Sequence, residues 1–137
     1  MKTAGYSQTP LAKKLGIKTG CKIQLIHQPK NYFELFSDFP SGIQFIKNSK
    51  TKKDLIHYFT SDAESLKKDL PELKNEMEQN GMIWISWPKK SSKVQTAVSE
   101  DVVRNLALKT GLVDIKVCAI DETWSGLKLV IPVKDRM

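Results

Sequence analysis

Two segments of this chain carry side chains that could bind or transform a ligand, and each follows an apolar run. The first is a loop of lysines and serines at residues 89–93, directly after the strand-like run 82–87. Lysine supplies positive charge and serine hydroxyls donate hydrogen bonds, so this loop could hold a phosphate or a carboxylate. The alternative is a solvated loop after a buried strand. The ligand-binding candidates here are Trp87, Lys89, Lys90, Ser91 and Ser92.

The second segment, residues 121–126, follows the apolar run 113–120 and contains two adjacent carboxylates. Asp121 and Glu122 could act as a general acid and base or bind a metal. Adjacent residues on a strand point to opposite faces, so both would meet one substrate only if a turn reorients them. The alternative is a hairpin in which Gly126 takes a positive φ and Trp124 covers the core. The candidates here are Asp121, Glu122, Thr123 and Trp124.

Histidine and cysteine spacing favours no metal site, and no cofactor is predicted. His27 and His57 fall on neighbouring predicted strands, but Cys21 lies about 20 Å from His27 along an extended segment. Cys21 and Cys118 both lie in apolar runs, which is typical of buried, reduced thiols. The sequence contains no nucleophile elbow, Walker loop, Gly-x-Gly-x-x-Gly or Cys-x-x-Cys motif.

The composition is that of one ordinary globular domain covering residues 1–137. Hydrophobic residues make up 40% of the chain and charged residues 27%, which excludes a disordered polymer. No apolar run reaches the roughly 18 residues that a membrane span requires. The amino-terminal residues also lack the apolar core of a secretory signal, so we expect a cytoplasmic protein.

The net charge of +7 favours a polyanionic partner such as nucleic acid. The lysines, however, occur in scattered groups with acidic residues between several of them, and the only arginines are Arg104 and Arg136. Arginine is the preferred bidentate reader of phosphates and guanine. The sequence therefore favours a generally basic, solvated surface over nucleic-acid binding.

Strands alternate with helices along the chain. The predicted strands are residues 21–27, 43–46, 54–59, 82–87, 113–120 and 127–133. The predicted helices are residues 9–16, which Thr9 caps, 31–37, which carries Phe33 and Phe36 inward, 61–81, which is kinked or restarted at Pro71, and 99–111, with Leu108 on its apolar side. A capping box at residues 61–64 opens the third helix, Gly81 ends it, and Ser99 caps the fourth.

This order predicts an α/β fold: a three-layer, mostly parallel Rossmann-like sheet that ends in an antiparallel β-hairpin. Ligands of such open sheets bind beyond the carboxyl ends of the strands. The loops at residues 28–29, 60–61, 87–89 and 121–122 would all lie at that edge. We therefore expect the two candidate segments to converge on one crevice.

Three motifs give the chain a specific resemblance. They are GYSxTPLxKKLGIKxG at residues 5–20, WPKKSS at 87–92 and DETWSGL at 121–127. Together they resemble a bacterial family known only as a domain of unknown function, over nearly the whole chain. More distantly, residues 15–20 before the first strand and 76–81 before the tryptophan-containing strand are similar to class I S-adenosylmethionine-dependent methyltransferases. That resemblance implies a sheet ending in a parallel and then an antiparallel strand.

The chain departs from the methyltransferase pattern at its first loop. Those enzymes follow their first strand with a glycine-rich loop, whereas this chain has residues 27–30, His-Gln-Pro-Lys. Proline removes a backbone donor, and without glycine the backbone has no close approach to a cofactor. Residues 42–54 are also too few for the usual additional helix and strand, so the fold is predicted to be trimmed.

These observations favour a non-catalytic binding domain whose partner is a small anionic ligand or another protein, bound between the 89–93 loop and the 121–126 hairpin. A small enzyme acting on an anionic substrate is the first alternative. In it, Asp121 or Glu122 would be the base and Lys89 or Lys90 the electrophile. A weakly RNA-associated basic protein is the second alternative.

Overall fold

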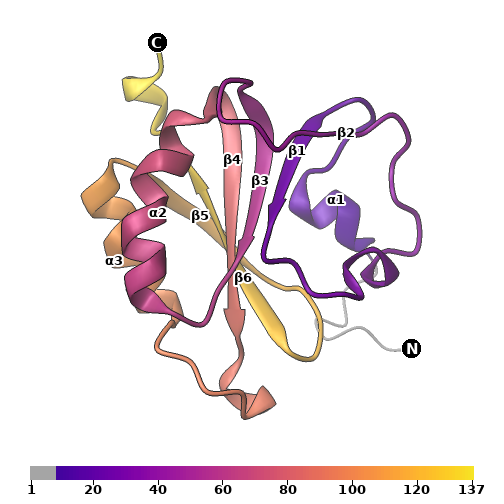
Figure 1. Ribbon diagram of the computed structural model, residues 1–137, viewed down its shortest axis with the longest axis vertical. Coiled ribbons are helices and arrows are strands. Elements are labelled where there is room, and N and C mark those ends of the chain that lie inside the picture. Colours follow the sequence, from indigo (N-terminus) through magenta and orange to yellow (C-terminus); the bar gives the residue numbers. More distant parts are fainter. Residues whose placement is uncertain (1–8) are drawn as a thin grey trace.

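Six strands form one sheet in the order β2-β1-β3-β4-β6-β5 (Figure 1). The computed structural model describes residues 9–137. The strands are β1 (Lys22–Ile26), β2 (Gln44–Phe45), β3 (Lys53–Phe59), β4 (Met77–Pro88), β5 (Val113–Ala119) and β6 (Trp124–Val130). The first four run parallel to one another, and β6 is antiparallel to both β4 and β5. The predicted Rossmann-like sheet with a terminal antiparallel hairpin is confirmed.

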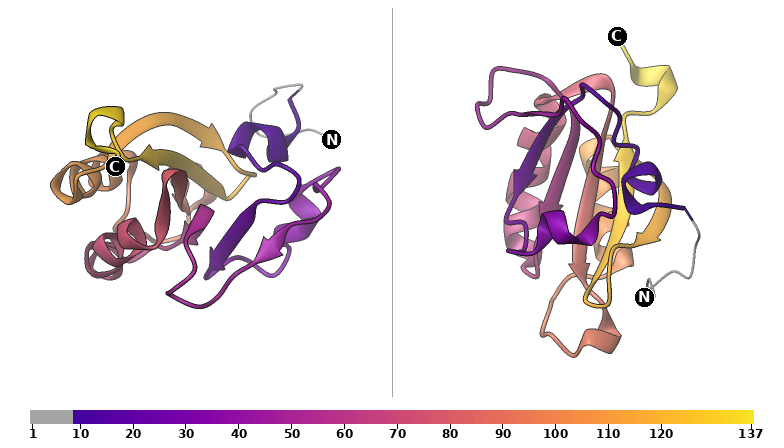
Figure 2. Two further views of the ribbon diagram at one scale, coloured as in Figure 1. Left: turned by 90° about the horizontal axis from the view of Figure 1, so that it is seen from above. Right: turned by 90° about the vertical axis from the view of Figure 1, so that its right-hand side faces the viewer.

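Helices cover both faces of this sheet. They are α1 (Leu11–Leu15), α2 (Ala63–Asn75) and α3 (Glu100–Thr110), with the 3₁₀ turns η1 (Tyr32–Leu35), η2 (Lys90–Ser92) and η3 (Val133–Asp135). Seen from above, α2 and α3 lie on one side and α1 on the other (Figure 2). One apolar core lies beneath α2 and α3, and a second lies beneath α1 and η1.

The helix ends follow ordinary capping chemistry. The α3 helix begins at Ser99, whose Oγ accepts from the Val102 amide at 3.3 Å, and ends at Gly111 with a φ of 89°. The cap of α2 is Asp62 rather than Ser61, because the Asp62 carboxylate accepts from the Glu64 amide at 3.0 Å. The cap of α1 is Pro10 rather than the predicted Thr9.

The predicted end of α2 at Gly81 is wrong. The helix ends at Asn75, and Met77 already pairs with Lys53 as the first residue of β4. Gly81 lies buried inside β4, where a Cβ atom would come within 3.0 Å of the Asp54 carbonyl oxygen. Strand pairing with β3 therefore overrides the helical spacing of Leu73 and Met77.

Two predicted core residues lie at the surface instead. Phe33 is 50% exposed and Leu108 is 55% exposed, whereas Tyr32 is buried. The segment at residues 32–35 forms a 3₁₀ turn, which changes the face that each side chain occupies. Phe33 packs edge-on against Phe39 and Phe45 at the β2 end of the sheet.

Gly126 lies inside β6 and not in the hairpin turn, and it does not have the predicted positive φ. A Cβ atom at this position would lie 3.1 Å from Ser86 Oγ and 3.2 Å from Trp84 Cε3. Glycine is needed here because side chains of β4 and of Ile120 crowd the backbone. The turn itself spans residues 120–124, with the Ile120 amide donating to the Trp124 carbonyl at 2.9 Å.

Replacing this glycine should therefore destabilise the fold by overpacking. We expect Gly126→Ala to lower the free energy of unfolding by about 1–3 kcal/mol, measured by urea denaturation. The neighbouring Ser125→Ala is the matched control and should stay within about 0.5 kcal/mol. A Gly126→Ala variant as stable as the control would show that the crowding is absent in solution.

Candidate functional site

The two candidate segments meet at the carboxyl edge of β4. Pro88 pairs with Trp124 across the β4–β6 ladder, and the Lys89 amide donates to the Thr123 carbonyl at 2.7 Å. The loops that follow β1 and β3 leave the sheet at the same edge (Figure 1). The predicted contact between the two loops is therefore present in the backbone.

The lysine and serine loop holds its own shape through Ser92. The Ser92 hydroxyl donates to the Lys89 carbonyl at 2.6 Å and accepts from the Val94 amide at 3.2 Å. Lys93 closes the turn with a φ of 64°. Ser92 is therefore occupied by the loop, whereas Ser91 and Lys90 are exposed to solvent.

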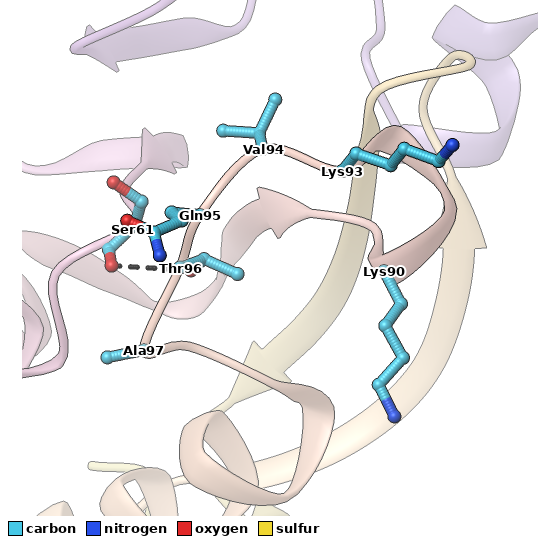
Figure 3. A pocket seen from close by; sticks show the side chains of 7 residues that line it. All are labelled: Ser61, Lys90, Lys93, Val94, Gln95, Thr96 and Ala97. Carbon is cyan, nitrogen blue, oxygen red and sulfur yellow. Dashed lines mark hydrogen bonds between the residues drawn. The ribbon is translucent and has the colours of Figure 1, made fainter.

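An open cavity of about 620 Å³ lies between this loop and the end of β3. Its lining consists of Ser61, Lys90, Lys93, Val94, Gln95, Thr96 and Ala97. The Thr96 hydroxyl donates to the Ser61 carbonyl at 3.3 Å and ties the two walls together (Figure 3). The side chains of Lys90 and Lys93 leave the loop in different directions (Figure 3). Among the described residues, the lining thus includes two lysines and no carboxylate.

A smaller cavity of about 310 Å³ lies beside the first one. Lys90 and Thr96 line both cavities, and Trp87 and Ser99 line only the smaller one. The Trp87 side chain is only 7% exposed and belongs to the core beneath α2 and α3. Trp87 therefore acts mainly as a core residue whose edge reaches a ligand-sized space.

The hairpin segment contributes differently from the prediction. Asp121 Oδ1 accepts from the amides of Thr123 at 2.8 Å and Trp124 at 2.7 Å, so this carboxylate shapes the turn. Trp124 packs edge-on against Phe59 with a centroid distance of 5.0 Å, on the α1 side of the sheet. The expectation that Trp87 and Trp124 meet across one crevice is wrong, because adjacent strand positions place them on opposite faces.

The residues of the turn stand apart from the two cavities. Within the described chain, residues 121–124 contribute nothing to the lining of either cavity. Glu122 is exposed at the tip of the turn, and Thr123 is half-buried. A ligand-binding role for these residues stays a prediction.

Sequence reasoning missed a buried polar chain on the α1 side. The Tyr32 hydroxyl lies 3.1 Å from His57 Nδ1, and His57 Nε2 lies 2.8 Å from Ser86 Oγ. The order resembles a nucleophile and its base, but all three residues are at most 1% exposed. The available signal was a polar residue within an apolar run of each strand, His57 within residues 55–59 and Ser86 within residues 82–87. The surrounding core closes these three side chains off from solvent.

Burial of His57 in this row of polar side chains predicts a pH dependence of stability. Burial lowers the pKa of His57 to about 3, while an unfolded histidine titrates near about 6.5. Below the unfolded pKa, protons bind the unfolded chain and not the folded one, so stability is lost as the pH falls toward 3. Between pH 7.5 and 5.5 the free energy of unfolding should fall by about 1.4 kcal/mol from this group.

Urea denaturation at both pH values tests this expectation. His57→Gln should remove most of the pH dependence whatever its effect on absolute stability. His27→Gln, which changes the exposed histidine, should retain it. Equal pH dependence in the wild type and His57→Gln would show that His57 titrates normally in the folded protein.

Comparison with known sequences and structures identifies the family and the fold of this chain. Residues 46–133 match the family described as protein of unknown function (DUF3052). No match emerged among curated protein sequences. Every helix in the described part of the chain is too short or too polar to cross a membrane.

Solved structures of S-adenosylmethionine-dependent methyltransferases share the fold. One from Aquifex aeolicus has a TM-score of 0.59 and 15% identity, over 88% of this chain and 88% of that one. A TehB-like enzyme from Corynebacterium glutamicum has a TM-score of 0.57 and 12% identity, over 88% and 85%. Magnesium protoporphyrin IX methyltransferase from Synechocystis has a TM-score of 0.53 and 10% identity, over 88% of this chain and 78% of that one. The methyltransferase-like resemblance is therefore confirmed for the fold.

The residues at the first loop do not fit the cofactor of those enzymes. His27 takes a positive φ of 58° without being glycine, and the Pro29 carbonyl accepts from the Tyr32 amide at 3.0 Å. Tyr32 and Phe36 then fill the space above the sheet with buried aromatic rings. This loop offers no glycine-lined approach of backbone amides to a ligand.

Proposed function

Because this chain belongs to the DUF3052 family of proteins of unknown function, we propose a role from its own geometry: a non-catalytic domain that binds a small anionic ligand. The ligand lies in the cavity between the η2 loop and the end of β3. Lys90 and Lys93 supply the charge, and the Thr96 hydroxyl and Ser61 supply polar contacts.

One observation carries this proposal: the cavity lining contains two lysines and no carboxylate. An open parallel sheet binds its ligands beyond the carboxyl ends of the strands, and this cavity lies at the ends of β3 and β4. Lysine side chains are long and flexible, so their ammonium groups can turn inward when an anion enters. The pairing supports a phosphate or carboxylate ligand.

The commitment of the local polar groups supports binding over catalysis. Asp121 Oδ1 already accepts two amide hydrogens in its turn and Asp121 lines neither cavity, while Ser92 already donates and accepts within its loop. A general base needs a free oxygen or nitrogen within reach of a substrate proton. The enzyme alternative rests on the contact between Lys89 and Thr123, which brings a lysine near Glu122.

Calorimetric titration with inorganic pyrophosphate tests the anion site. The wild type should bind, and Lys90→Gln/Lys93→Gln should bind about tenfold or more weakly, because a hydrogen bond to a charged group contributes about 1.5–3 kcal/mol. Lys50→Gln/Lys109→Gln removes the same charge from exposed positions at the other edge of the sheet. That control should stay within twofold of the wild type. Equal losses in both variants, or no binding by the wild type, would overturn the site.

The first loop generates a second expectation. S-adenosylmethionine should give no measurable heat of binding at about millimolar concentration, because residues 27–31 lack the glycine approach that a phosphate- or nucleoside-binding loop requires. A parallel native mass spectrum of the freshly purified protein should contain no species heavier by the mass of this cofactor. A micromolar dissociation constant would show that the chain is a methyltransferase-like cofactor binder after all.

A further inference from the structure

The α1 side of the sheet gathers lysines from distant parts of the chain. The sequence contains no aspartate or glutamate before Glu34, so the segment that forms α1 and β1 carries lysines alone. The hairpin strands β5 and β6 add Lys116 and Lys128, and their only carboxylate is Asp114. That carboxylate accepts from Arg104 of α3 at 3.1 Å, on the other side of the sheet.

Strand register places the hairpin lysines together. Lys116 and Lys128 are direct partners in the β5–β6 ladder. Lys128 is also the direct partner of Trp84, whose Nε1 donates to the Leu15 carbonyl at 2.8 Å. Because this bond fixes α1 on the sheet, α1 lies beside β6 on this face (Figure 2).

The lysines of α1 complete the group. Burial raises the pKa of Cys118 while the positive charges of Lys14 and Lys116 oppose that rise, and the charges of Lys116 and Lys18 add to the effect of burial on the pKa of Lys128. We call these four residues, Lys14, Lys18, Lys116 and Lys128, the α1-side lysine cluster. They come from two segments that are far apart in the sequence and that the fold brings to one face.

Carboxylates in the described part of the chain leave the charge of this cluster without an ion-pair partner. Among the described residues, the ion pairs involve Lys53 and Arg104, and none joins a cluster lysine to a carboxylate. Like charges that face each other on paired strands are destabilising. The pKa of Lys128 is lowered by burial and by the positive charges of Lys116 and Lys18. An external polyanion would relieve this repulsion.

We propose that the α1-side lysine cluster binds the phosphate backbone of nucleic acid. Four separated cations spread over one face match a row of phosphates better than a single compact anion. A membrane is disfavoured, because α1 and β6 contribute no exposed large apolar side chain and the only ones beside the cluster among the described residues are Ile115 and Val117 of the edge strand β5. The exposed Val117 pairs with Leu127, which belongs to the core beneath α2 and α3, so Val117 lies on the opposite face of the sheet from the lysine cluster.

The same composition defines the mode of binding. Trp124 of β6 is packed edge-on against Phe59, so its ring is not free to stack on a base. Because the described residues of this face supply no free aromatic ring and no arginine to the cluster, the cluster contacts phosphates and not base edges. Binding is therefore indifferent to sequence, extends to duplex RNA and duplex DNA alike, and weakens steeply with salt.

Fluorescence anisotropy with mixed-sequence duplex RNA and duplex DNA of 20 base pairs tests this surface. The logarithm of the wild-type binding constant should fall with the logarithm of salt concentration with a slope of about −3 to −4, which corresponds to four phosphate contacts. Lys116→Gln/Lys128→Gln should reduce the magnitude of that slope by about two. Lys14→Gln/Lys18→Gln should also reduce the slope by about two. This second variant keeps the test decisive if Lys116→Gln/Lys128→Gln fails to fold.

Two charge-matched controls separate the cluster from total charge. Lys67→Gln/Lys68→Gln changes exposed residues of α2 on the opposite face, and Lys50→Gln/Lys109→Gln changes exposed residues that belong to neither proposed site. Both should retain the wild-type slope. Equal loss in all four variants would mean a diffuse charge effect and would overturn the proposal. It would also be overturned by no duplex binding at about 50 mM salt, or by binding to phosphatidylserine vesicles in place of duplexes.

Discussion

The position of α1 and the approach of β6 to β4 both depend on the buried indole of Trp84. Its Nε1 donates to the Leu15 carbonyl, and this bond ties the short helix α1 to the middle of the sheet. An α-helix of five residues is too short to persist without such tertiary contacts. The other edge of the indole crowds Gly126, which explains the absence of a side chain there. Helix position and strand spacing thus depend on one side chain.

Much of the fold could be predicted because local chemistry and global topology agree. Ser99 and Gly111 bound α3 as their residue types indicate, and the apolar run of β4 could only be a buried strand. The error at Gly81 arose because the spacing of Leu73 and Met77 fits a helix as well as a helix followed by a strand. Only the pairing of Met77 with Lys53 decides between them, and pairing is not visible in sequence.

The candidate site was predicted in location more than in detail. Contact between the η2 loop and the hairpin turn follows from topology, and the backbone bond from Lys89 to Thr123 is present. The orientation of each side chain depends on register, and that is where prediction failed for Trp124. Residues 94–97, which wall the larger cavity, were overlooked because they lack charged or aromatic side chains. Their role comes from the path of the loop and not from their chemistry.

Lys116 lies in β5, the strand at one free edge of the sheet. Its neighbours Ile115 and Val117 are exposed apolar residues, 53% and 46%, in an extended segment whose outer amides and carbonyls have no strand partner within the described sheet. Such an edge invites pairing with another polypeptide, and a lysine in its centre is a common safeguard against it. The positive charge that faces Lys128 also opposes edge-to-edge pairing of β5 with another strand, so one residue contributes to the basic surface and to the protection of the sheet edge.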